Sequence, residues 1–244
     1  MAPVWISRSF TNALFALGLA SLAGPVALAA PTDFSGRYSI STKGVEVGEY
    51  RLALRTTPQG GYEAAASTKP VGLFGRVLRS IESRETARGR YTDTALAPER
   101  YEQEFAEDGG RTDSLRFDPA KGVIEFRYKD ANGQHPYDPR ALDPLSLRFT
   151  LVADAAANRL RGEYTVATRD SIKSYRVHLG PEARTTTPLG SLVTRPLTQQ
   201  REGSSRTLVY HLAPSRGWIP VRIVQFKEGK EKLSIDLEEI SGRR

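Results

Sequence analysis

Alternation of apolar and polar residues constrains the fold of this chain most strongly. In EKLSIDLEEI, residues 231–240, Leu233, Ile235 and Leu237 alternate with polar residues, and in YRLALR, residues 50–55, Leu52 and Leu54 do the same. Successive side chains of a strand point to opposite faces of a sheet, so a period of two places one face of each strand in a core and the other in water. The pattern predicts antiparallel strands with one solvated face.

Turn-forming residues separate these runs at intervals of roughly 8 to 12 residues, the spacing of an antiparallel meander. Each turn supplies a Gly or Asn that can adopt a positive φ angle. The segments are TKG (42–44), PQGG (58–61), EDGG (107–110), DPAKG (118–122), DANG (130–133) and KEGK (227–230). The sequence therefore predicts hairpins that follow one another along the chain.

One segment, LDPLSLRFTLVADAAANRL (142–160), breaks the period of two. Asp143 is suited to cap a helix, Pro144 to occupy its first position, and Leu145, Phe149 and Val152 recur at helical spacing. We expect a helix from Pro144 to about Ala157. The predicted fold is all-β with one helix: a strongly curved antiparallel sheet or open half-barrel, with the central helix packed in or over the concave side.

Residues 1–30 have the pattern of a secretory signal peptide, with Arg8, an apolar stretch and an A-x-A sequence that favours cleavage after Ala29 or Ala30. An uncleaved anchor is the alternative, but the apolar stretch falls short of the roughly 20 residues that span a bilayer. We expect export to the periplasm and one β-rich domain over residues 31–244. The chain has no cysteine, so neither disulfides nor an amino-terminal lipid anchor are expected.

The formal net charge is +7, and the predicted leader contributes only Arg8 to it. The basic residues are scattered, which is typical of a mixed-sign surface with a mild bias toward anionic envelope surfaces. We expect no nucleic-acid partner for an exported chain. Polar residues such as Glu125, Arg127, Asp236 and Glu238 occupy whole strand faces, so an integral membrane protein is not expected either.

The residues show no motif for catalysis or for a metal or other cofactor. His135, His178 and His211 are far apart and lack a metal-ligand spacing. We interpret His135 as a turn residue and His178 as a rim residue. No serine stands in a nucleophile motif, although Ser80 and Ser171 are available hydroxyls. We expect no metal, no cofactor and no enzyme activity, while a hydrolase assembled only in space stays open.

Two further segments allow a functional and a structural interpretation. In KPVGLFGRVL (69–78), Leu73 and Phe74 stand between Gly72 and Gly75, as a mobile apolar lip over a cavity or as a bulge where a strand bends. In HLAPSRGWIPVRIVQF (211–226), APSRG predicts a turn, and His211 should point away from the core face. Trp218 should then cover the end of the hairpin with its ring on the core.

Three stretches together resemble a bacterial exported family known as domain of unknown function 3108. They are YSISTKGVEVGEYRL (38–52), LDPLSL (142–147), and TPLGSLVTRPL (187–197) followed by LVYHLAPSRGWIPVRI (208–223). The resemblance covers nearly all of residues 33–240 and implies no catalytic residue, because the family has no established activity. The last pair of elements is also similar to the closing strands of LolA/LolB-type lipoprotein carriers, which implies an apolar cavity.

These features favour a non-catalytic binding or carrier protein for an apolar or amphipathic envelope ligand, such as a lipid, acting as a monomer. The candidate cavity-lining residues are Leu73, Phe74, Leu145, Phe149, Val152 and Trp218. The alternative is a structural or interaction module that contacts envelope proteins through a sheet edge or its basic face.

Overall fold

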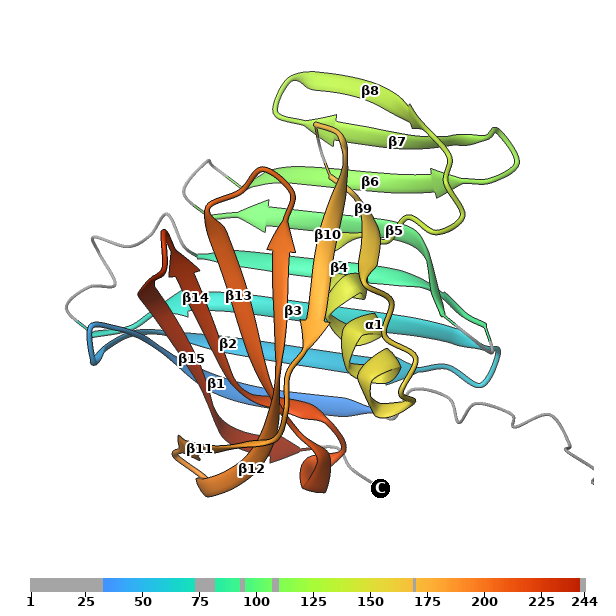
Figure 1. The fold of residues 1–244 in the computed structure, drawn as a ribbon. Helices are drawn as coiled ribbons and strands as arrows, with labels where there is room; N and C mark the ends of the chain where they lie inside the picture. The colour runs from blue at the N-terminus through green and yellow to red at the C-terminus, as the bar shows by residue number, and fades with distance from the viewer. Residues whose placement is uncertain (1–32, 73–81, 93–94, 107–109, 169, 242–244) are drawn as a thin grey trace, which may run out of the picture.

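A computed structural model describes residues 33–72, 82–92, 95–106, 110–168 and 170–241 (Figure 1). Over these ranges the chain forms one antiparallel sheet of fifteen strands and one α-helix. None of the described helices has the length and apolar character that spanning a bilayer requires. The predicted leader lies outside the described residues.

The first eight strands lie side by side in chain order and form the layer at the back of Figure 1, here called the back layer. They are β1 (Phe34–Thr42), β2 (Val45–Thr56), β3 (Gly61–Pro70), β4 (Ser83–Tyr91), β5 (Leu96–Phe105), β6 (Arg111–Asp118), β7 (Val123–Tyr128) and β8 (Ala131–Pro136).

The remaining strands form the front layer, which crosses the back layer at a steep angle in Figure 1. They are β9 (Glu163–Ala167), β10 (Ile172–Leu179), β11 (Ala183–Thr187), β12 (Gly190–Arg201), β13 (Arg206–Ala213), β14 (Ile219–Lys227) and β15 (Lys230–Ser241). Strand β15 pairs with β1, so the two layers are one sheet that folds over along this pair, and β11 pairs only with β12.

The helix α1 (Pro144–Ala156) lies between the two layers on the side away from the β1–β15 pair (Figure 1). Just before it, Leu142 pairs with Val166 of β9 in an isolated parallel bridge, which ties the start of the helix to the edge of the front layer. The predicted fold class, a curved antiparallel sheet with a central helix on its concave side, is confirmed.

Local turn chemistry explains most of the hairpins. Lys43 and Gly44 both have positive φ angles (50° and 76°), as do Glu228 and Gly229 (54° and 73°). Two such residues in succession form the hairpin turn whose twist matches that of the strands. The turns predicted at TKG and KEGK are thereby confirmed.

The turn predicted at DANG was placed too late in the chain. The turn between β7 and β8 contains Lys129 with a φ angle of 53°, and Ala131, Asn132 and Gly133 already belong to β8. Gly133 is needed for another reason, because a Cβ atom there would overlap with the Phe126 ring on the neighbouring strand. Gly133 is thus present to make room for an aromatic ring, and its presence in the sequence was wrongly interpreted as a turn.

The start and end of α1 agree with the predicted signals. The Asp143 carboxylate accepts hydrogen bonds from the backbone N–H groups of Leu145 and Ser146, both at 2.8 Å, and Pro144 occupies the first turn. The helix ends at Ala156, and Asn158 then has a φ angle of 53°. Capping satisfies N–H groups that would otherwise lack a partner at a buried helix end.

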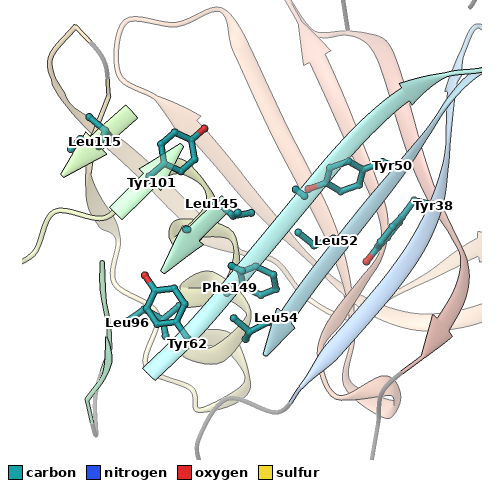
Figure 2. Close-up of a cluster of buried hydrophobic side chains, with 14 of the residues drawn as sticks. Tyr38, Tyr50, Leu52, Leu54, Tyr62, Leu96, Tyr101, Leu115, Leu145 and Phe149 are labelled. Atoms are coloured by element: carbon teal, nitrogen blue, oxygen red, sulfur yellow. The ribbon is translucent and has the colours of Figure 1, made fainter. Parts of the chain in front are cut away.

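The single apolar stripe predicted for α1 was incomplete, because the helix is buried on two faces. Leu145 and Phe149 pack into the core of the back layer, whereas Leu147 and Leu151 pack into a second cluster with β9 and β12–β14. A helix enclosed between two layers buries most of its circumference. Figure 2 shows Leu145 and Phe149 pointing toward Leu52 and Leu54 of β2.

The end of the β13–β14 hairpin also matches its prediction. Pro214–Arg216 form one turn of 3₁₀ helix, Gly217 is left-handed, and β14 begins at Ile219. Trp218, with a φ angle of 64°, is half-buried and packs against the second cluster.

Candidate functional site

The inner face of the sheet changes from apolar to polar along its strands. On β4 the inward positions run from Ala87 to Glu85, and on β12 they run from Leu197 to Gln199. Antiparallel register aligns these polar positions at the same end of both layers. The half of the interior away from the packed core is therefore polar.

An ion pair lies at the boundary between the two halves. Both Nη atoms of Arg148, on α1, lie 3.0 Å from Oε1 of Glu85, and Nη2 also lies 3.2 Å from Oε2. Glu85 is only 8% exposed, whereas 26% of the Arg148 side chain remains accessible. Arg148 therefore lies between the layers with part of its side chain still accessible.

Three buried tyrosines surround this ion pair. Arg148 donates to the Tyr50 hydroxyl at 3.0 Å, Tyr101 donates to Glu85 at 3.0 Å, and Tyr210 donates to Gln199 at 2.9 Å. Burial raises the pKa of all three phenols above the usual value, while the Arg148 charge acts in the opposite direction on each. The phenols therefore stay protonated at neutral pH; Tyr101 and Tyr210 donate hydrogen bonds, and Tyr50 accepts one from Arg148.

The ion-paired state of Arg148 is also favoured electrostatically. Burial acts to lower the pKa of its guanidinium. The Glu85 carboxylate and the surrounding phenols act in the opposite direction and outweigh burial, so the pKa lies well above its usual value. An opposite charge in contact favours the charged form. The interior thus holds a permanent cation next to neutral phenol donors.

A cavity of about 220 Å³ opens between the two layers, next to this network. We call it the cleft cavity; Tyr101 and Gln103 belong to both the cavity and the network. Its lining consists of Tyr101, Gln103, Asp113, Ser114, Leu115, Pro144, Thr168, Asp170, Lys173 and Arg201. It is thus enclosed by β5 and β6 on one side, β10 and β12 on the other, and the start of α1.

The charges in the cleft cavity are partly compensated. Lys173 lies 3.0 Å from Asp170, and Asp113 lies 3.2 Å from Arg111. Arg201 is exposed and has no ion-pair partner within the described ranges. The mouth of the cleft therefore keeps a cation available.

The two walls beside the cavity differ in chemistry. Glu85 and Gln103 face inward from the back layer, whereas Val177 and Leu208 face inward from the front layer opposite Gln199. Val177 and Leu208 are only half-buried although they point into the fold. The front layer thus presents partly accessible apolar side chains on its inner face, next to the polar residues that line the cavity itself.

The four described residues that were predicted to line a cavity are not among those that line the cleft cavity. Leu73 and Phe74 lie outside the described residues. Leu145 is fully buried and Phe149 is 7% exposed, both within the back-layer core, while Val152 and Trp218 are half-buried against the second cluster. Their role as cavity lining stays a prediction.

Sequence reasoning missed Glu85, Gln103 and Gln199, although the signal is present. Each occupies a position of its strand whose side chain points to the core face. Glu85, for example, is two residues from the buried Ala87. A polar residue in a core phase must find a partner between the layers. Partner identity, such as Arg148 for Glu85, depends on how the helix packs.

The histidines do not converge in the described part of the chain. His135 lies on β8, not in a turn as predicted, because β8 begins two residues after Lys129; its ring stacks on Phe126 at 4.8 Å. His178 is exposed on β10, as expected of a rim residue. His211 faces away from Tyr210 and Leu212, as predicted, and lies 3.1 Å from the Thr185 hydroxyl.

The described residues contain no group of three or more metal-ligating side chains. Of the two available hydroxyls, Ser80 lies outside the described residues, and Ser171 is half-buried with its Oγ buried and without a hydrogen-bond partner.

Comparison with solved structures supports the fold. A β-barrel-like protein of domain of unknown function DUF1849 from Brucella abortus matches with a TM-score of 0.56 and 9% sequence identity, covering 86% of this chain and 97% of that one. At this identity the likeness concerns the fold alone.

Two further structures match less closely, each with a TM-score of 0.36. One is the MucA/MucB complex of Pseudomonas aeruginosa, at 9% identity, covering 86% of this chain and 51% of that one. The other is a chain described as a lipoprotein from Parabacteroides distasonis, at 13% identity, covering 88% of this chain and 97% of that one.

Comparison with curated proteins gives no match. Among family models, one described as "Protein of unknown function (DUF3108)" matches residues 37–236.

Proposed function

Because the chain belongs to the DUF3108 family, whose description assigns no activity, we propose a function from the site itself. The protein is a periplasmic, non-catalytic binding or carrier protein for an amphipathic envelope ligand, whose polar group occupies the cleft cavity. The observation that carries this proposal is the cavity between the layers, with Arg148 and its tyrosines beside it.

The hydrogen-bonding groups of the site support binding of a polar headgroup. Tyr101 and Gln103 line the cavity, and Lys173 and Arg201 supply cations at its mouth. A ligand pocket usually combines a few convergent polar groups with apolar surface. The half-buried Val177 and Leu208 lie on the inner face of the front layer outside the cavity lining, and we assign them the role of that apolar surface.

The size of the cavity narrows the ligand class. At about 220 Å³, it lies below the roughly 300–1,000 Å³ typical of pockets that enclose a whole drug-sized ligand. It matches a headgroup better than a whole lipid. An apolar tail would then extend along the front wall of the cleft.

A cavity-filling variant tests the proposal. Gln103→Trp places a large side chain in the cleft, and Glu104→Trp is its matched control, since Glu104 is exposed on the opposite face of the same strand. We expect the wild type and Glu104→Trp to yield a co-purifying amphiphile by solvent extraction and mass spectrometry. Gln103→Trp should yield at least about tenfold less, the loss that 1.4 kcal/mol of binding energy represents.

A direct titration complements the extraction. Binding of dansyl-undecanoic acid, followed by its fluorescence, should be weakened in Gln103→Trp and unchanged in Glu104→Trp. Equal binding by all three proteins, or no binding by the wild type after delipidation, would contradict the proposal.

A further inference from the structure

Three arginines lie directly opposite one another on the outer face of the back layer. Arg88 of β4 pairs in register with Arg100 of β5, and Arg100 pairs with Arg116 of β6. We call Arg88, Arg100 and Arg116 the outer arginine row. All three are exposed, and the side chains of Arg100 and Arg116 are 49% and 61% accessible.

This arrangement disfavours folding unless something offsets it. Neighbouring strands are about 5 Å apart, so paired residues bring their charges close together. Like charges directly opposite each other destabilise a sheet. Repulsion within the row therefore lowers the stability of the sheet, and the exposed arginine side chains do not pack into its core.

Neighbouring carboxylates compensate the row only in part. Arg100 lies 2.6 Å from Glu102, and Arg116 lies 3.8 Å from both Asp118 and Glu125. Arg88 lies directly opposite Glu63 of β3 in register, but the two side chains form no ion pair within 4.0 Å in the described ranges. Exposed ion pairs are weak and exchange readily, so these arginines remain available to another anion.

The same face is hollowed along the row. Two shallow hollows of about 610 Å³ and 540 Å³ meet at Arg100, which lines both. Together they are lined by five arginines and three glutamates, namely Arg55, Arg88, Arg100, Arg116, Arg127, Glu63, Glu102 and Glu125. The surface thus carries more arginines than glutamates, with the three neighbouring arginines of the row at its centre.

We propose that this outer face docks onto the phosphate groups of an anionic phospholipid membrane. Guanidinium groups match phosphate oxygens with two parallel hydrogen bonds, and each bound phosphate relieves repulsion within the row. A broad sheet face can engage several headgroups at once. This docking surface goes beyond the proposed ligand site, which lies on the opposite face of the same strands.

The lining of the hollows favours a membrane over a nucleic acid. Binding of single strands uses aromatic side chains on which bases stack. Phe126 is the one aromatic residue among those lining the two hollows, and its ring stacks on His135 on the inner side of the sheet. The expected export of the chain also favours a phospholipid partner.

Vesicle co-sedimentation tests the proposal. The probes are vesicles of phosphatidylcholine alone and of an equal mixture of phosphatidylcholine and phosphatidylglycerol. The wild type should bind the anionic vesicles selectively and lose this binding at high salt. The triple variant Arg88→Gln/Arg100→Gln/Arg116→Gln should bind them about 100-fold more weakly, at roughly fivefold per arginine.

A matched control separates the row from net charge. The triple variant Arg176→Gln/Arg184→Gln/Arg216→Gln removes the same charge from exposed sites on β10, β11 and the turn before β14. It should bind anionic vesicles within about threefold of the wild type, because local charge falls off within a Debye length. An equal loss in both variants would overturn the proposal.

Two further readouts distinguish the remaining outcomes. The thermal midpoint of the row variant should equal or exceed that of the wild type, so a lower midpoint would assign the row a structural role instead. If the protein bound an oligonucleotide through the arginine row but did not bind vesicles, the proposal of a membrane partner would be rejected. Gln103→Trp should leave vesicle binding intact. The proposal of ligand binding in the cleft and the proposal of membrane docking can therefore fail independently.

Discussion

Arg148 on α1 and Glu85 on β4 are 63 residues apart in the chain and meet in a forked ion pair between the two layers, with Nη1 and Nη2 each 3.0 Å from Oε1. The pair joins the helix to the back layer at the point where the packed core gives way to the cleft. Glu85 also accepts a hydrogen bond from Tyr101. The pair therefore couples helix position to the geometry of the candidate site.

Removal of one member of this pair should destabilise the fold. Glu85→Gln leaves Arg148 between the layers without its counter-charge, and loss of one partner of a buried pair costs about 3–5 kcal/mol. We expect the free energy of unfolding, measured by urea denaturation, to fall by about 3 kcal/mol, since part of Arg148 stays accessible. The double variant Glu85→Gln/Arg148→Met should recover most of this loss; a double variant as unstable as the sum of both single variants would contradict the pairing.

Asp143 should make stability depend on pH between about 4 and 7. Burial raises the pKa of this capping carboxyl from 3.8 to about 6, against the effect of its hydrogen bonds from Ser146 and Leu145. Because the folded-state pKa is raised, the stabilisation is fully present below the unfolded value and is lost as the pH rises through about 6. The difference in unfolding free energy, wild type minus Asp143→Asn, should fall by about 3 kcal/mol over this range.

Asp138 provides the control for that measurement. A backbone hydrogen bond from Arg140 lowers the pKa of Asp138, so its stabilisation is present above pH 3.8 and is lost only as the pH falls further. Asp138→Asn should therefore leave the profile between about pH 4 and pH 7 nearly parallel to that of the wild type. A parallel profile for Asp143→Asn as well would show that Asp143 is not the titrating group.

Phe149→Ala should be among the more damaging changes in the helix. The ring is 7% exposed and packs into the back-layer core, so its removal should cost about 3–5 kcal/mol. Val152→Ala, at a half-buried position, should cost only about 1 kcal/mol. Chemical denaturation of both variants checks the order. Equal small losses would instead agree with the earlier expectation that Phe149 lines an open cavity.

Gly89→Ala should destabilise the β4–β5 hairpin. A Cβ atom at Gly89 would overlap with the backbone carbonyl oxygen of Ala97, which cannot rotate away as a side chain could. We expect a loss of about 2–3 kcal/mol, as for other overpacked sites. Gly162→Ala, where a Cβ atom meets nothing within 4 Å, should change stability by less than about 1 kcal/mol. Thermal denaturation of the two variants should therefore give clearly different midpoints.

Local signals predicted the elements of this fold. Alternation in YRLALR identified Leu52 and Leu54 as core residues of β2, and Asp143 with Pro144 marked the start of α1. Such features depend on a few neighbouring residues, so they can be recognised without a structure. The error at Gly133 arose because a glycine that accommodates an aromatic ring resembles a turn glycine in sequence.

The candidate site could not be assembled in the same way. Leu147 and Leu151 form a second buried face of α1 only because the front layer covers the helix. Glu85 stands in a core phase, but its meeting with Arg148 depends on the packing of a helix 63 residues further along the chain. The described cavity consequently lies among residues other than the predicted set.

The sequence by itself determined several strands, most of the predicted turns and the one described α-helix, because these follow from alternation, positive φ angles and capping between near neighbours. Tertiary structure decided which strand ends meet, and thereby placed Tyr101 and Gln103 opposite Lys173 and Arg201 and aligned Arg88 with Arg100 and Arg116. Strand register and layer packing join residues far apart in the chain. Their energies depend on the whole fold, so local patterns can mark single polar residues in core positions but cannot assemble the cleft or the outer arginine row.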